Sequence, residues 1–333
     1  METRSAYRGG VLVSSNGMHE MAERIARLLG ERGTPLRHIR AEHTQFANGE
    51  LKPWIPETVR GEHVFLLHPL QAPDPNTAIM LMLLTADALT RASVAGITLV
   101  LPYIPYLRQD RKDRPRTPIS ARLIADLIES NSRVERIITL DMHADQEQGF
   151  FSIPVDNINA RVIHAEHYRK KFCGDFSTVS VLAGDFGGAV RARRFATLLD
   201  ARVPVSIIDK RRTGPNQAEV IGFVGESVTG RDVILYDDML DTGGTARGAV
   251  AEVMRLGARS VEICVTHGLF SNNAEAAFKT AGYPVVVTPT IPRAPAYWEM
   301  HASWLTSVPI DELLASAIYE ASLVGGSVSK LSD

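Results

Sequence analysis

The residues best suited to chemistry are two adjacent acids followed by a glycine turn, in V-I-L-Y-D-D-M-L-D-T-G-G-T-A-R-G-A from Val233 to Ala249. The acids follow a short apolar run that ends at Tyr236 and is typical of a strand buried on both faces, and helical patterning resumes after Gly244. In parallel sheets, ligands bind beyond the carboxyl ends of the strands. The motif is therefore predicted to lie at a ligand site, where a strand gives way to a helix.

The turn has the composition of a phosphate-binding loop. Gly243 and Gly244 can adopt positive φ and let a ligand approach the backbone. Thr242, Thr245 and the first amides of the helix can donate hydrogen bonds to an anion. A D-T-G-G-T turn alone would also suit a simple strand-to-helix connection.

The acid pair Asp237 and Asp238 favours the functional interpretation, because like charges side by side are costly without a cation or hydrogen-bond donors. Two carboxylates beside a phosphate can accept hydrogen bonds from sugar hydroxyls or help to hold a divalent cation. This order of elements resembles the 5-phosphoribosyl 1-diphosphate (PRPP) binding motif of type I phosphoribosyltransferases and PRPP synthetases. The motif indicates the class of ligand and leaves the reaction open.

Short apolar strands alternate with helical segments along the chain, which predicts an α/β fold with parallel sheets. The pattern restarts near Asp156, so two domains are expected, at 1–157 and 158–333. Strands are expected at 10–14, 36–39, 64–67, 97–101, 137–140, 179–182, 205–208, 233–236, 261–266 and 285–287. Helices are expected at 18–29, 77–92, 119–128, 160–172, 190–199 and 310–321.

Composition excludes several classes of protein. Apolar residues make up 45% and charged residues 22% of the 333, as in a globular protein with a substantial core. A net charge of -2 gives no electrostatic reason to expect nucleic acid as a partner. Cys173 and Cys264 lack metal-ligand spacing and suit a reducing compartment. With no apolar run near the ~20 residues of a membrane span, a cytoplasmic protein is expected.

Other charged loops follow predicted strands. Several cations lie between Arg108 and Arg116, directly after the strand at 97–101, and His143 lies between Asp141 and Asp145 after the strand at 137–140. A solvated charged face and a structural histidine are the default interpretations. Their positions favour instead an anion near the cations and a metal ion near the histidine.

Taken in order, the loops resemble those of the ribose-phosphate diphosphokinases, also called PRPP synthetases. The similarity covers nearly the whole chain. One matching segment would be weak evidence for the family, whereas eight segments in the same order are strong evidence. The segments are F-A-N-G-E, R-Q-D-R-K-D, P-I-S-A-R-L, D-M-H-A-D-Q-E-Q-G-F-F-S-I-P-V-D-N, G-D-F-G-G, D-K-R-R, V-I-L-Y-D-D-M-L-D-T-G-G-T and T-H-G-L-F-S. The resemblance implies two tandem doubly wound parallel-sheet domains of the type I phosphoribosyltransferase-like kind.

The implied reaction is transfer of the diphosphoryl group of ATP to the 1-hydroxyl of ribose 5-phosphate, with Mg²⁺, giving PRPP and AMP. The resemblance places ATP in the first domain, on Phe46, Asn48, Glu50, Arg108, Gln109 and Asp113, with Phe46 stacking on adenine. It places Mg²⁺ on His143 and Asp185. It places the ribose hydroxyls on Asp237 and Asp238, and the 5-phosphate on Asp241, Thr242, Gly243, Gly244 and Thr245.

The catalytic pair implied by the resemblance is Lys210 and Arg212, in the D-K-R-R segment, which is expected to be mobile. Diphosphoryl transfer needs alignment and neutralisation of developing charge, which two cations can supply. The resemblance also implies a homo-oligomer, a dimer assembled into a tetramer or hexamer, in which F-A-N-G-E serves a neighbouring subunit. A possible regulatory phosphate or ADP site is implied at Gln148, Asn157, Ser327 and Ser329.

Some segments depart from the family pattern. The loop from His68 to Asn76 replaces a more usual Gln-Ser segment, and Pro289 stands where an acidic or amide residue is common. These departures affect the expected regulation and subunit contacts more than the chemistry. Two alternatives remain, a type I phosphoribosyltransferase that consumes PRPP and a non-catalytic regulatory paralogue of the synthetase.

Overall fold

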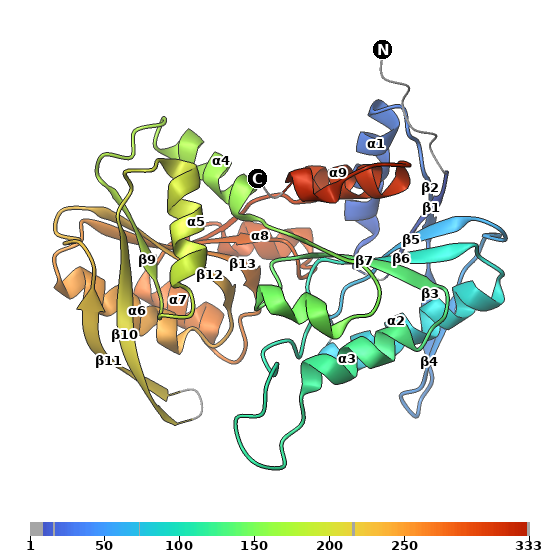
Figure 1. Ribbon diagram of the computed structural model, residues 1–333, viewed down its shortest axis with the longest axis horizontal. Helices are drawn as coiled ribbons and strands as arrows, with labels where there is room; N and C mark the ends of the chain where they lie inside the picture. Colours follow the sequence, from blue (N-terminus) through green and yellow to red (C-terminus); the bar gives the residue numbers. More distant parts are fainter. Residues whose placement is uncertain (1–8, 16, 73, 215–216, 332–333) are drawn as a thin grey trace. The chain divides into compact units, whose positions relative to one another are not determined.

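The computed structural model describes residues 9–15, 17–72, 74–214 and 217–331 (Figure 1). The described chain divides into two compact units. The N-terminal unit runs to Asn159 and includes Thr290–Pro292 and the segment from Ile310 onward. The C-terminal unit consists of Ala160–Pro289 and Arg293–Pro309.

The N-terminal unit is built on a parallel sheet with the order β2-β1-β5-β6-β7-β8 among the described residues. The strands are β1 (Val11–Ser14), β2 (Arg37–Arg40), β5 (His63–Leu67), β6 (Gly96–Leu101), β7 (Val134–Leu140) and β8 (Val155–Ile158). The helices are α1 (His19–Glu31), α2 (Pro75–Arg91), α3 (Ser120–Glu129) and α9 (Asp311–Ser322). β1 and β6 are buried along their whole length, as expected for strands covered on both faces.

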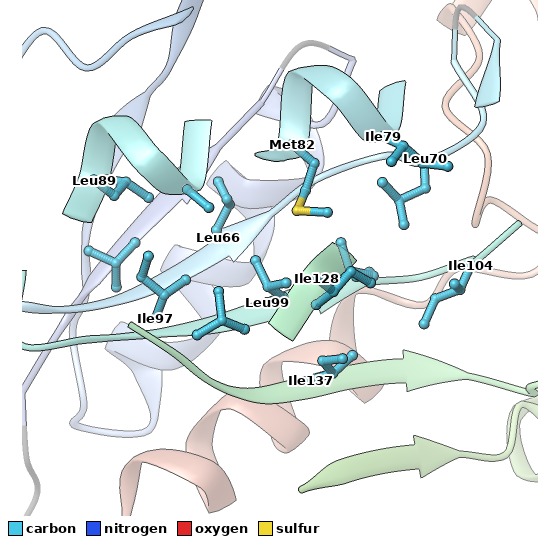
Figure 2. Packing of buried hydrophobic residues seen from close by; sticks show 14 of the residues in the cluster. Leu66, Leu70, Ile79, Met82, Leu89, Ile97, Leu99, Ile104, Ile128 and Ile137 are labelled. Carbon is cyan, nitrogen blue, oxygen red and sulfur yellow. The ribbon is translucent and has the colours of Figure 1, made fainter. Parts of the chain in front are cut away.

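Alternate residues of these strands form the core beneath α2 and α3 (Figure 2). Leu66, Leu99 and Ile137 point to the same face from three neighbouring strands, and Met82 of α2 and Ile128 of α3 cover them (Figure 2). This arrangement follows from the period of two in a strand and the spacing of three to four in a helix.

The segment between β5 and α2, which departs from the family pattern, supports the start of the helix. The Asp74 side chain accepts hydrogen bonds from the amides of Asn76 and Thr77, both at 3.0 Å, and Pro75 occupies the first helical position. The helix thus begins at Pro75, although the prolines suggested no helix before Asn76. The ring of Pro75 is tolerated there because the first amides of a helix have no intrahelical acceptor.

The C-terminal helix α9 belongs to the N-terminal unit, which corrects the division at 157/158 followed by a continuous second domain. Its Asp311 accepts a hydrogen bond from Arg24 of α1 at 2.9 Å, and Glu312 pairs with Arg32, the residue that caps the C-terminus of α1. Sequence patterning indicated the helix but carries no information about which sheet a distant helix covers. The change of unit after Asn159 falls two residues beyond the predicted boundary.

The C-terminal unit has a sheet with the order β11-β10-β9-β12-β13-β14-β15 over its described residues, parallel except for the edge strand β11. The strands are β9 (Val179–Ala183), β10 (Val205–Gly214), β11 (Gln217–Val224), β12 (Asp232–Leu240), β13 (Ser260–Gly268), β14 (Val285–Thr288) and β15 (Leu305–Ser307). The helices are α4 (Arg161–Lys171), α5 (Ala189–Leu199), α6 (Gly244–Arg255), α7 (Ala274–Ala281) and α8 (Pro295–His301).

β12 presents alternate residues to two separate cores. Val233 and Leu235 pack with α6 and α7, whereas Ile234 and Tyr236 pack with α4 and α5. Both units are therefore parallel sheets with helices on their faces, and the predicted α/β fold class is confirmed. No helix in the described ranges is long and apolar enough to cross a membrane.

Two buried histidines predict a loss of stability in acid. Burial lowers the pKa of His68 to about 4 and that of His164 to about 3. Because both values lie below the 6.5 of the unfolded chain, the stabilisation is full above pH 6.5 and is lost as the pH falls toward the folded values. We expect the free energy of unfolding to drop by roughly 1.4 kcal/mol per histidine and pH unit below about pH 6.5.

Urea unfolding at about pH 7 and about pH 5 measures this effect. His68→Gln should reduce the difference between the two free energies, because burial no longer opposes protonation at that position. An undiminished difference in His68→Gln would contradict the assignment.

Candidate active site

The acid pair lies within β12, before the strand ends. β12 continues to Leu240 and pairs with β13 as far as Gly268, so Asp237 and Asp238 belong to the strand, whereas the predicted strand ended at Tyr236. The Asp238 side chain is buried and that of Asp237 is 31% exposed. Alternation along the strand directs the two neighbours differently, which accounts for the unequal exposure.

Arg191 of α5 contacts both acids. Its Nη1 donates to Asp237 Oδ1 at 2.8 Å and to Asp238 Oδ1 at 3.3 Å. The amide of Asp238 also donates to Asp237 Oδ1, at 2.9 Å. Burial and the neighbouring Asp238 raise the pKa of Asp237, and the guanidinium of Arg191 opposes that rise. The pair is thus an anionic site that one cation partly neutralises.

The G-D-F-G-G loop lies beside the acid pair, because β9 and β12 are neighbours in the sheet. Asp185 Oδ1 accepts a hydrogen bond from the amide of Gly188 at 3.1 Å. A Cβ on Gly184 would lie 3.6 Å from Asp237 Oδ2, and one on Gly188 3.8 Å from Asp237 Oδ1. These distances place Gly184 and Gly188 next to Asp237, so Asp185 lies in a loop that borders the acid pair.

The D-T-G-G-T turn leads from β12 into α6. Gly243 caps the helix in the left-handed conformation, with φ 70° and ψ 4°. Arg247 Nη1 donates to the carbonyl oxygen of Thr242 at 3.2 Å, which fixes the turn from the helix side. Gly244 and Thr245 at the start of α6 are exposed. A helix start with exposed residues is the kind of position that can bind an anion, and that role of the turn stays a prediction.

The D-K-R-R segment lies in a β-hairpin. β10 runs from Val205 to Gly214 and pairs antiparallel with β11, with Lys210 opposite Val220 and Arg212 opposite Ala218. Register shifts occur on both sides of the segment, between 209 and 210 and between 212 and 214. The side chains of 210–221, including those of Lys210 and Arg212, lie outside what the structure describes.

The F-A-N-G-E segment forms the tip of a second hairpin, in the N-terminal unit, where the sequence indicated only a polar turn. β3 (Glu42–Gln45) pairs with β4 (Leu51–Trp54), and the amide of Phe46 donates to the carbonyl of Glu50 at 2.8 Å. The Asn48 side chain accepts from the amide of Glu50 at 3.2 Å. Phe46 is 49% exposed, so its ring presents a surface on which a planar group can stack.

Arg108, Gln109 and Asp113 lie in the loop between β6 and α3, and all three are exposed. The Gln109 side chain accepts a hydrogen bond from Ser120 at the start of α3, at 2.6 Å. Oδ2 of Asp113 lies 3.9 Å from Nε of Arg114. The loop thus begins at the carboxyl end of a buried strand, as predicted, and is tied to the next helix through Gln109.

His143 follows β7, at the start of the loop that becomes the 3₁₀ helix η1 (Asp145–Phe150), and is partly exposed. Within the described ranges, no three His, Cys, Asp or Glu side chains are arranged to hold a metal ion. The metal-binding roles that the resemblance implies for His143 and for Asp185 stay predictions.

Comparisons with protein families and with individual relatives identify the family of this chain. The N-terminal domain of ribose phosphate pyrophosphokinase matches residues 10–131, and the phosphoribosyl transferase domain matches residues 154–298. The ribose-phosphate pyrophosphokinase of Corynebacterium efficiens is 41% identical over 329 residues, covering 98% of this chain and 96% of that protein. The chain belongs to the ribose-phosphate pyrophosphokinase family.

Further comparisons agree with this assignment. The ribose-phosphate pyrophosphokinase of Ureaplasma parvum is 41% identical over 273 residues, covering 81% of this chain and 79% of that protein. The crystal structure of phosphoribosylpyrophosphate synthetase from Mycobacterium smegmatis matches with a TM-score of 0.80 at 35% identity, covering 94% of this chain and 98% of that chain. The protein is thus an enzyme of the ribose-phosphate pyrophosphokinase family, as its sequence predicted.

In this pyrophosphokinase the residues of the possible regulatory site lie on elements that meet around β8. Asn157 belongs to β8, and its side chain accepts from the amide of Met142 at 3.0 Å. Gln148 belongs to η1, and Ser329 to the 3₁₀ helix η2 (Val328–Leu331), both of which contact β8. The hydroxyls of Ser327 and Ser329 are 2.8 Å apart. Whether they bind phosphate or ADP stays a prediction.

Of the two departures from the family pattern, Pro289 lies just after β14 and forms an isolated bridge with His267 of β13. The segment between His68 and Asn76 is described except for residue 73. Both departures have structural partners in this enzyme, and neither lies beside the acid pair in sequence.

Sequence reasoning missed Arg191, the cation on the acid pair. In A-V-R-A-R-R it cannot be told from Arg193 and Arg194 by composition. Position offered a signal, because Arg191 precedes the buried Phe195 by one helical turn and therefore continues the buried face of α5 toward the strand ends.

A substitution tests the turn of this pyrophosphokinase. In Gly243→Ala the new Cβ would lie 2.3 Å from the Phe278 ring at a positive φ. We expect the free energy of unfolding to fall by about 2–4 kcal/mol, measured in urea. In Gly248→Ala, within α6, the Cβ meets no atom within 4 Å, and we expect a gain of up to about 1 kcal/mol. Equal stabilities for the two variants would contradict the inferred strain.

Proposed function

We propose that the enzyme transfers the β,γ-diphosphoryl group of ATP to the 1-hydroxyl of ribose 5-phosphate, giving PRPP and AMP. The observation that carries the proposal is the combination of the acid pair and glycine turn with an N-terminal region that matches the pyrophosphokinase domain over residues 10–131. A phosphoribosyltransferase would need only the acid pair and the glycine turn. The names of the relatives support the same reaction.

Ribose 5-phosphate would bind at the end of β12. Asp237 and Asp238 would accept hydrogen bonds from ribose hydroxyls, because ionised carboxylates are pure acceptors. The 5-phosphate would lie at the start of α6, where Gly243 brings exposed amides toward the ligand. The phosphate site would comprise Asp241, Thr242, Gly243, Gly244 and Thr245.

ATP would bind through the N-terminal unit. Phe46 would stack on adenine, with Asn48 and Glu50 beside it, and its 49% exposure supports that role. Arg108, Gln109 and Asp113 would complete the nucleotide site. In a homo-oligomer, which we propose on the same resemblance, the exposed hairpin tip would serve a neighbouring subunit.

Magnesium fits the donors that the chain offers. Mg²⁺ prefers oxygen ligands and usually takes one or two protein carboxylates, with substrate phosphates and water supplying the rest. The carboxylate of Asp185 is a donor of this kind. Asp185 and His143 would hold the ion, which when bound would neutralise charge on the ATP phosphates.

Catalysis would depend on positioning and charge. Lys210 and Arg212 would stabilise the negative charge that develops on the transferred group, since phosphoryl transfer needs little covalent chemistry from the protein. No nucleophilic side chain is required. We place the reaction in the cytoplasm, where both substrates and reduced cysteines are expected.

The test is formation of AMP from ATP in the presence of Mg²⁺, with and without ribose 5-phosphate. We expect AMP only when ribose 5-phosphate is present, together with an equal amount of PRPP. A protein that instead consumes PRPP with a nucleobase would be a phosphoribosyltransferase. Absence of both activities, in a protein that associates with active subunits, would indicate the regulatory paralogue.

A further inference from the structure

The hydrogen bonds from Arg191 to the acid pair lie next to an aromatic contact between α5 and β12. One helical turn after Arg191, Phe195 stacks on Tyr236, with ring centroids 4.0 Å apart and planes 5° from parallel. Tyr236 immediately precedes the acid pair. The stacked rings are both fully buried and fix the register of the helix on the strand. Arg191 is thus placed over Asp237 and Asp238 by packing as well as by charge.

The hydrogen bonds place one nitrogen between two carboxylates. Nη1 of Arg191 reaches the Oδ1 atoms of both acids, at 2.8 Å and 3.3 Å, so a single group limits their separation. Asp237 Oδ1 also accepts the amide of Asp238. Both of these donors reach Oδ1 of Asp237, so Oδ2 of the same carboxylate is the oxygen that we assign to a ligand hydroxyl.

The electrostatic argument agrees with the geometry. The Asp238 side chain is only 4% exposed, and a buried carboxylate beside a second one is unfavourable without a compensating cation. The Arg191 side chain is itself 25% exposed and supplies that cation from the helix side. Burial and Asp238 already raise the pKa of Asp237, so loss of the guanidinium would raise it further and favour a protonated acid, which has one acceptor fewer for a sugar hydroxyl.

We propose that Arg191 is a positioning residue that holds Asp237 and Asp238 in the spacing required by the ribose hydroxyls and favours their charged form, and so sets the affinity for ribose 5-phosphate. The inference rests on the proposed function, because it assumes that the acid pair binds the sugar. Arg191 acts through the two carboxylates and needs no contact with the reacting atoms.

The experiment compares full-length variants in the AMP-forming assay. In Arg191→Gln we expect the KM for ribose 5-phosphate to rise about 10–100-fold, as for loss of a charge-assisted hydrogen bond, while the KM for ATP changes by less than about twofold. Arg191→Lys keeps the charge without the planar fork and should recover part of the affinity. Arg193→Gln, at an exposed position on the same helix, should match the wild type.

Each outcome decides the proposal. A KM for ribose 5-phosphate within about twofold of wild type in Arg191→Gln would overturn it, as would equal rises for ATP and ribose 5-phosphate. If Arg191→Gln does not fold, Arg191→Met, which also removes the charge, decides by the same criteria. A wild-type enzyme that forms no AMP would instead overturn the proposed function, and calorimetric titration of ribose 5-phosphate into wild type and Arg191→Gln would still test the bridge.

Discussion

Replacing Lys210 by alanine is expected to lower kcat by roughly 10³-fold or more, because cations that stabilise the charge of a phosphoryl-transfer transition state contribute on that scale. The KM for ATP should change by less than about threefold, since the interaction is made mainly in the transition state. Initial rates of AMP formation over a range of ATP concentrations give both constants.

The hairpin supplies a matched control for this variant. From 210 to 212 the backbone pairing of β10 with β11 is regular, so substitutions at these positions start from the same local structure. The resemblance gives no catalytic role to Arg211, so Arg211→Ala should retain most of the turnover, whereas Arg212→Ala should resemble Lys210→Ala. Near-normal kcat in Lys210→Ala would remove this residue from the mechanism.

The sequence predicted most of the elements that build the two sheets, because long apolar runs and helical spacing are strong signals. β6 at Gly96–Leu101 and α5 at Ala189–Leu199 lie within one residue of their expected bounds. The hairpin β3–β4 was missed, because E-H-T-Q in β3 has the polarity of a loop and three of its four residues are exposed. Short elements such as α8 and β15 lack the length that makes a pattern detectable.

For the site, the sequence identified the motifs, and the structure added their neighbours. The acid pair was expected after a strand, but β12 extends to Leu240 because pairing with β13 continues through the polar residues. A local pattern could not indicate that Arg191 contacts residues 46 and 47 positions later. The choice of the unit against which α9 packs likewise depends on long-range contacts. These are the packing of α9 on α1 and the Arg24–Asp311 ion pair.

A second substitution tests the role of the acid pair in binding ribose 5-phosphate. Asp238→Asn keeps the shape of the side chain and removes its charge, so it should raise the KM for ribose 5-phosphate by about 10–100-fold, since an ionised acceptor is replaced by a neutral amide. Removal of one of two adjacent charges also lowers the repulsion that raises the pKa of Asp237. The lost affinity should therefore come without a comparable loss in the free energy of unfolding, measured in urea.

Asp232→Asn, at the opposite end of β12, is the matched control for this variant. Asp232 accepts hydrogen bonds from Arg259 at 2.9 Å and from Ser260 at 2.7 Å, far along the strand from the acid pair. Its substitution should affect stability by up to about 1 kcal/mol and leave the KM unchanged. The double variant Arg191→Gln/Asp238→Asn should lose less affinity than the sum of the single effects, because the two residues act through one contact. Additive losses would mean that Arg191 and Asp238 bind the sugar independently, and an unchanged KM in Asp238→Asn would exclude the acid pair from the ribose site.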